Sequence, residues 1–133
     1  MSDDLAFLRA RIPEYKEYTE EAAVHDSDMR VRAYVGEALS AGQARLAASL
    51  DGEILTALEA TLLRCMFTDQ AFVRKFEHAD IAPAVLVALV KNDRSLVELA
   101  DRVATVTLGD FTALIRQIDE LFDLRRTPVA ATA

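Results

Sequence analysis

Apolar or small residues recur at the helical period through a long N-terminal stretch of this chain, and this pattern limits the possible folds more than any other feature. They stand three, four or seven positions apart: Val24, Val31, Val35, Leu39, Gly42, Leu46 and Leu50. Such spacing places them on one side of an α-helix. An unbroken helix over 14–49 would be roughly 50 Å long. The segment "HDSD" allows two helices instead, because Asp26 or Ser27 could cap a new start.

The remaining sequence also favours helices. Four Gly and three Pro are few for an all-β protein. Asp51–Gly52 predicts a turn, "KND" predicts a break with Asp93 as the next N-cap, and Thr107 could cap the last helix. Residues 103–109 could instead be extended, because they include β-branched side chains. We predict an all-α, single-domain bundle of about five or six helices over 1–126, with a long N-terminal helical segment, and a disordered tail over 127–133.

The charge balance is acidic, with 22 Asp and Glu against 15 Lys and Arg and a net charge of -7. Nucleic acid is therefore an unfavourable partner, since phosphate binding requires clustered basic residues. The longest apolar run, 81–90, is too short for a membrane span. Cys65 is the single cysteine, so it forms no intrachain disulfide, and the acidic first residues lead us to expect no signal peptide. We expect a cytoplasmic protein with no membrane association and no cofactor.

Glu21, His25 and Asp28 stand four and three residues apart, which places them on one face of a helix. Carboxylate and imidazole groups in this arrangement could bind one divalent ion. The alternative is a solvated helix face with a weak contact between Glu21 and His25.

Three other features have structural and chemical interpretations. His78 beside Asp80 could be a base with its orienting carboxylate, although such a loop histidine is also typical of a structural or exposed residue. Cys65, next to Met66 on an apolar helix face, is expected to be a core side chain. Phe72 and Phe76 are expected in the core.

The length of the N-terminal stripe predicts self-association. Short helices from the second half of the chain would not cover a long stripe, so a second copy could complete the burial. The residues predicted for this interface are Tyr15, Tyr18, Val31, Tyr34, Val35 and Leu39. Tyrosine is enriched at interfaces, although packing within one chain is an alternative for all three tyrosines.

Residues 95–121 have the outline of a helix-turn-helix. Thr112, Arg116 and Gln117 would then be exposed on the second helix and could contact DNA. Asp110, Asp119 and Glu120 on the same helix would repel phosphate, and the connection is longer than the usual three or four residues.

The stretch "RIPEYKEY", followed by "DMRVR", resembles the start of small uncharacterised helical bacterial proteins. Those proteins carry I-P-G-Y-x-x-Y and then D-x-x-L-R. The resemblance covers residues 11–45, with Glu14 in place of the glycine, and implies helices without assigning an activity.

These patterns favour a non-catalytic helical interaction or scaffold protein with an unknown partner, forming a homodimer, over an enzyme. The alternatives are a transcriptional regulator with a degenerate helix-turn-helix at 95–121 and a metal-binding helical bundle.

Overall fold

A computed structural model describes residues 3–18, 21–67 and 83–132, with side chains described over 3–18, 23–67 and 83–125. Its described residues form five α-helices and one short 3-10 turn, and contain no strand. The elements are α1 (Asp3–Arg11), α2 (Glu21–Leu46), η1 (Ala47–Ser49), α3 (Gly52–Met66), α5 (Pro83–Val103) and α6 (Leu108–Thr132). The prediction of an all-α bundle is confirmed.

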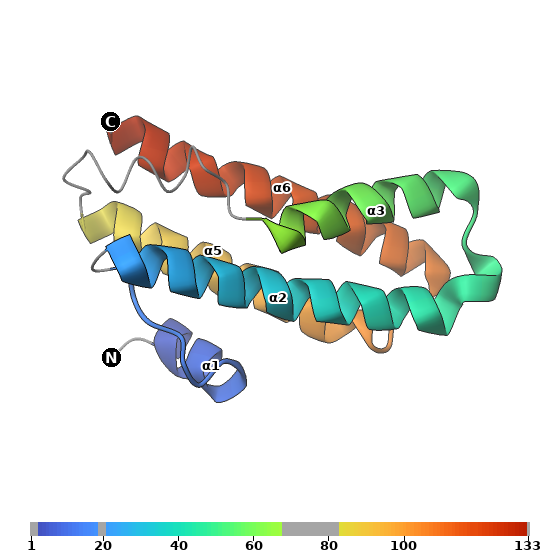
Figure 1. The fold of residues 1–133 in the computed structure, drawn as a ribbon, viewed down its shortest axis with the longest axis horizontal. Coiled ribbons are helices and arrows are strands. Elements are labelled where there is room, and N and C mark those ends of the chain that lie inside the picture. Colours follow the sequence, from blue (N-terminus) through green and yellow to red (C-terminus); the bar gives the residue numbers. More distant parts are fainter. Residues whose placement is uncertain (1–2, 19–20, 68–82, 133) are drawn as a thin grey trace.

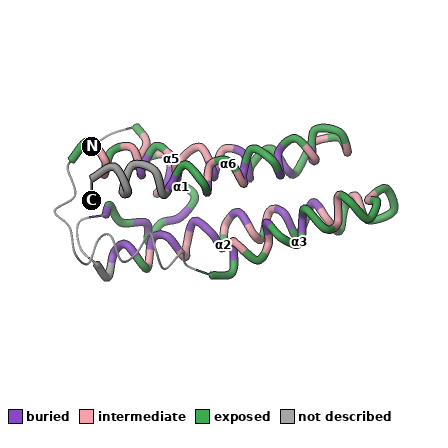
Figure 2. Tube along the Cα trace, turned by 90° about the horizontal axis from the view of Figure 1, so that it is seen from above, coloured by how far each residue is buried: buried purple, intermediate pink, exposed green. Residues whose placement is uncertain are grey.

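The bundle consists of two helical hairpins. Helix α2 packs against α3, and α5 packs against α6 along most of its length (Figure 1). The hairpins then meet through the α2–α5 and α3–α6 contacts, and their buried residues face one another across this boundary (Figure 2). The hairpins thereby bury the apolar stripes of α2, α5 and α6 inside one chain.

Helix α1 packs on the outside of α5. Arg11 pairs with Asp101 at 2.6 Å, and Arg94 pairs with Asp4 at 3.1 Å. The guanidinium of Arg11 also lies 3.6 Å from the centre of the Phe7 ring. Leu5 and Leu8 of α1 are buried, so the helix is attached by apolar packing as well as by charge.

The long N-terminal helix begins later than the sequence predicts, and of the two alternatives at "HDSD" it takes the uninterrupted one. Helix α2 has 26 residues, starts at Glu21 and runs through "HDSD". Ser27 does not cap a new helix: its hydroxyl donates to the carbonyl of Lys16 at 2.7 Å and accepts from the Lys16 amide at 3.0 Å. Asp26 pairs with Arg30 one turn later at 2.9 Å. These contacts hold both residues in mid-helix positions.

Helix α5 also runs through a predicted break. Asp93 is fully buried in the middle of α5, and "KND" is helical. Asp51, predicted as part of a turn, is the N-cap of α3, and Thr107 caps α6, which was one of its two predicted alternatives. The Asp51 carboxylate accepts from the amide of Ile54 at 2.9 Å, and the Thr107 hydroxyl accepts from the amide of Asp110 at 3.4 Å. Helix α6 continues to Thr132, beyond its predicted end at 126.

Gly42 lies where α2 closely approaches the turn between α5 and α6. A Cβ atom at this position would lie 2.6 Å from Val103 Cγ1 and 2.9 Å from Phe111 Cε1. Both neighbours are buried, so they have little room to move. The α2 backbone therefore needs glycine where it meets the α5–α6 turn.

Gly42→Ala is expected to lower the free energy of unfolding by about 1–3 kcal/mol, because the added methyl overpacks the core. Gly109→Ala is the matched control, since a Cβ atom there would meet nothing within 4 Å. That control should be neutral or stabilising by up to about 1 kcal/mol, as alanine favours helix. Urea unfolding of both variants measures the difference, and equal stabilities would contradict the close approach.

Candidate functional site

The most unusual feature of the interior is an arginine. Arg125 of α6 is 1% exposed and is the largest of the fully buried side chains in the described residues. Its guanidinium donates to Asp28 on α2, with Nη2 2.9 Å from Oδ1, and forms a short contact with Asp93 on α5. It also donates to Asn92 Oδ1 at 3.0 Å and to the Tyr18 hydroxyl at 2.6 Å. One side chain therefore links α2, α5, α6 and the segment before α2.

Two tyrosines complete the surroundings of Asp93. The Tyr15 hydroxyl donates to Asp93 Oδ2 at 2.6 Å, and the Tyr18 hydroxyl donates to the same oxygen. Their rings meet edge to face with centroids 6.4 Å apart. The non-helical segment between α1 and α2 is thus held in the core by its tyrosine hydroxyls as well as its rings.

Asp28 connects Arg125 to a second arginine. Its Oδ2 accepts from Arg32 Nε at 2.8 Å, one helical turn along α2. Arg32 also donates to the carbonyl of Arg64 on α3, and its guanidinium lies 4.8 Å from the centre of the Phe122 ring. We call Asp28, Arg32, Asp93 and Arg125, with Tyr15 and Tyr18, the buried charge cluster. Its two carboxylates and two guanidinium groups sum to zero charge.

The electrostatics of this cluster suit structure better than proton transfer. Burial raises the pKa of Tyr15, and the charge of Asp93 raises it further. Burial also raises the pKa of Tyr18 well above its usual value, so both hydroxyls stay protonated as donors. Burial raises the pKa of Asp93, while Arg125 and the hydroxyl donors oppose that rise. A general base needs reach to a substrate proton, whereas Asp93 is fully buried.

The residues predicted as metal ligands do not form one exposed site, because Asp28 is buried and His25 is exposed. His25 is exposed, whereas Asp28 is 0% exposed with both oxygens bound by arginines. The side chain of Glu21 lies outside the described ones. Within the described part of the chain, no group of three His, Cys, Asp or Glu residues could hold a metal ion. The predicted pair His78–Asp80, and the predicted core residues Phe72 and Phe76, also lie outside the described residues.

The stripe predicted to need a second chain is covered by its own chain. The buried members of the predicted interface are Tyr15, Tyr18, Val31, Val35 and Leu39. Tyr34 is half-buried, and its hydroxyl donates to Asp101 at 2.5 Å. The expectation that the second half of the chain offers only short helices was wrong, because α5 has 21 residues and α6 has 25. Self-association stays a prediction, but it loses these residues as its basis.

The predicted DNA-binding residues lie on an antiparallel hairpin. Arg116 and Gln117 are exposed, and the hydroxyl of Thr112 donates to the carbonyl of Leu108 at 3.3 Å. Helices α5 and α6 lie side by side in opposite directions (Figure 1). The helices of a DNA-binding helix-turn-helix cross at roughly 90–120° instead. DNA binding therefore stays a prediction without support from this geometry.

Cys65 lies in the core, as expected. The Cys65 side chain is 5% exposed, and a Cβ atom added to Gly36 would lie 3.1 Å from the Cβ atom of Cys65. Burial raises the pKa of its thiol to about 11.

Cys65 should react slowly with a disulfide reagent at pH 8, because the reactive thiolate is scarce and covered. We expect a rate at least about tenfold below that of the urea-unfolded chain, which serves as the control. Stopped-flow absorbance measures both rates, and equal rates would contradict the burial of the thiol.

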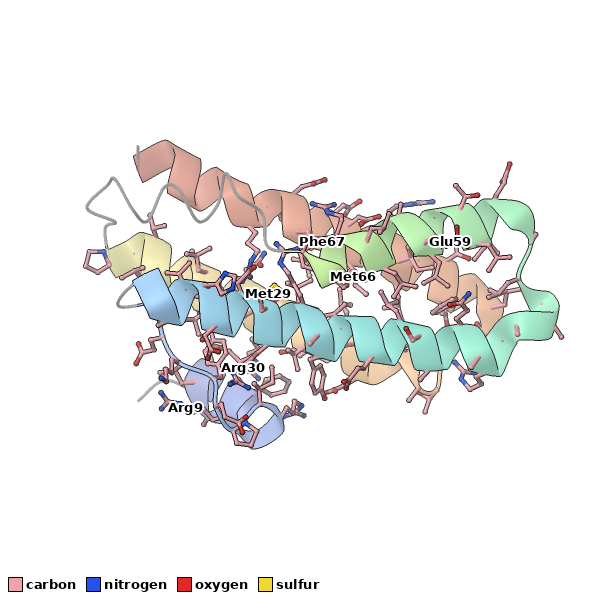
Figure 3. The ribbon with its side chains drawn as sticks, in the orientation of Figure 1. Arg9, Met29, Arg30, Glu59, Met66 and Phe67 are labelled. Carbon is pink, nitrogen blue, oxygen red and sulfur yellow. The ribbon has the colours of Figure 1, made fainter. Side chains whose placement is uncertain are left out.

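The surface carries an apolar groove that the sequence did not predict. It lies between α2 and α3, has a volume of about 610 Å³, and is lined by Met29, Arg32, Ala33, Gly36, Glu37, Ser40, Leu62, Cys65 and Met66. We call it the α2–α3 groove. Three large apolar side chains are exposed at the adjoining end of α3: Leu63, Met66 at 62% and Phe67 at 64%. Figure 3 shows Met66 and Phe67 at this end of α3, with Met29 on the neighbouring helix.

A second cavity of about 530 Å³ lies between α1 and the start of α5. Leu5, Val87 and Val90 supply apolar walls, and two acidic and two basic side chains also line the cavity: Asp4, Glu17, Arg9 and Lys91. These four charges sum to zero, and Asp4 and Lys91 are 3.7 Å apart. This cavity therefore has a less distinct chemical character than the α2–α3 groove.

The chain matches no protein-family model, no curated protein and no solved structure in the comparisons. Among its described residues, no helix is both long and apolar enough to cross a membrane.

Proposed function

We propose that this chain is a non-catalytic helical interaction protein that binds another protein through the α2–α3 groove. The observation that carries the proposal is that exposed Met66 lines an apolar groove, with exposed Leu63 and Phe67 at the same end of α3. Large exposed apolar side chains that gather beside a groove mark binding surfaces. Their exposure is costly in water, and a bound partner would remove that cost.

The interior supports the same proposal. The charged groups of the buried charge cluster bind one another, so they act as a structural core. Cys65 lines the groove, but burial raises the pKa of its thiol to about 11, which disfavours a nucleophile. The chemistry that the groove offers is therefore contact rather than reaction.

A photo-crosslinking amino acid at position 66 tests this proposal in the native cells. We expect discrete adducts from position 66, and their loss when Phe67 is also replaced by glutamate. The same amino acid at Leu124 is the control, because Leu124 is 55% exposed but lies on α6, away from the groove. Adducts at twice the mass of the chain would identify self-association as the form of the interaction. An absence of adducts from position 66 would overturn the proposed function.

A further inference from the structure

We infer that the partner in the α2–α3 groove is an amphipathic helix with lysine or arginine along its polar flanks, an inference that rests on the proposed function. The groove lies between two helices of one hairpin, and its lining runs along α2 from Met29 to Ser40. An amphipathic helix fits such a site by placing its apolar side in the groove.

The floor and walls of the groove suit a helical partner. Gly36 and Ala33 are small, and the close approach of Gly36 to Cys65 forms part of the floor. Met29 and Met66 come from α2 and α3, respectively. Methionine side chains are flexible and polarizable, so they adapt to the apolar side chains of an incoming helix. Phe67 lies at the end of α3 and could extend this apolar contact.

Acidic groups flank the groove from both helices. Glu37 lines it from α2. Glu59 lies three and seven residues before Leu62 and Met66, so it shares their face of α3. Both glutamates are exposed, and no basic side chain in the described part of the chain pairs with either one.

Within the described part of the chain, the basic side chains of α2 and α3 at this end of the hairpin are already engaged. Arg32 pairs with Asp28 at 2.8 Å, and Arg64 pairs with Asp123 at 2.8 Å and with Asp119 at 3.4 Å. The flanks therefore present a negative charge, in keeping with the net charge of -7. Complementary charge speeds encounter and selects partners. A basic amphipathic helix matches the groove in both polarity and shape, and an acidic one would be repelled.

Two synthetic helical peptides of about five turns test the inference on the full chain. Both carry leucine on one face, and one carries lysine on the flanks where the other carries glutamate. We expect the lysine peptide to bind at least about tenfold more tightly by fluorescence anisotropy, with weakening at higher salt. Equal affinities for the two peptides, or no binding of either, would overturn the inference.

Variants locate the binding. Met66→Glu should reduce affinity for the lysine peptide at least about tenfold, because a charge enters the apolar contact. Glu37→Gln with Glu59→Gln should reduce it about threefold to tenfold and lower the salt dependence. Leu124→Glu is the matched control and should leave affinity unchanged. An equal loss in Leu124→Glu and Met66→Glu would indicate non-specific attraction and overturn the inference.

Two failures remain distinguishable. If neither peptide binds but position 66 still gives adducts in cells, the partner has different chemistry and the proposed function stands. If wild-type protein sediments as a dimer and Met66→Glu as a monomer, the occupant is a second copy of this chain. That result would overturn the basic helix while keeping the groove as an interaction site.

Discussion

Arg125→Met should lower the free energy of unfolding at pH 7 by about 3–5 kcal/mol, because it leaves the buried carboxylate of Asp93 without the positive charge of Arg125. Arg125 is 1% exposed and contacts both Asp28 and Asp93, which are each 0% exposed. Asp28 keeps Arg32 as a partner, but Asp93 would keep only hydroxyl donors. Urea unfolding measures the loss. Arg116→Met is the control on the same helix, and as an exposed residue it should change stability by less than about 0.5 kcal/mol.

The loss in Arg125→Met should depend on pH in a defined direction. Burial already raises the pKa of Asp93 in the native protein, and loss of the Arg125 charge would raise it further. The folded variant would then hold a proton that the unfolded chain releases above its ordinary carboxyl pKa. The cost of the buried Asp93 carboxylate is therefore absent below the ordinary carboxyl pKa. It appears as the pH rises through the pKa of Asp93 in the folded variant. A loss in the free energy of unfolding, relative to wild type, that is the same at pH 4 and pH 7 would contradict this account.

Asp93→Asn should be destabilising by about 3–5 kcal/mol at pH 7, because it leaves the cluster with an uncompensated positive charge. The double variant Asp93→Asn with Arg125→Met restores neutrality, since Asp28 and Arg32 remain as a pair. Its loss should therefore be smaller than the sum of the two single losses by about 1–3 kcal/mol. A double-mutant cycle from urea unfolding measures this coupling energy. Strict additivity would show that the two side chains contribute only separate packing.

Helix positions and apolar faces were largely predictable from the sequence, because the 3.6-residue period is a local property. The stripe from Val24 to Leu39 is buried as its spacing indicates. The same period did not identify what covers the stripe. Coverage depends on how α2 packs against α3 and α5, and this is a long-range property that a periodicity count leaves open.

The buried charge cluster was missed because its members have a more common local role. Aspartate is a favoured N-cap, so Asp93 after "KN" was interpreted as a helix start. Its tertiary contacts with Arg125 and the tyrosines override that local preference. A signal was nevertheless present in the sequence. Asp28 lies four residues after Val24 and three before Val31, and Arg125 lies three residues after Phe122, so both occupy apolar stripes.

The α2–α3 groove was missed for a related reason. Leu62 and Met66 belong to the apolar period of α3, which predicts burial for both. In the structure Leu62 is half-buried and Met66 is exposed, because the end of α3 lines an open groove beside α2 and no other described helix covers that side. Exposure at a helix end depends on which helices lie beside it in space, and periodicity alone contains no such information.

The central claim is that one chain covers its own N-terminal stripe and closes its own charge cluster. Urea unfolding at about 1 μM and about 100 μM protein tests it most directly, since a fold that needs a second chain gains stability with concentration. Met66→Glu should be used beside wild type, because it disrupts the exposed groove without touching the interior. We predict the same unfolding midpoint for Met66→Glu at both concentrations. A midpoint that rises with concentration in that variant would show that the stripe requires a partner chain.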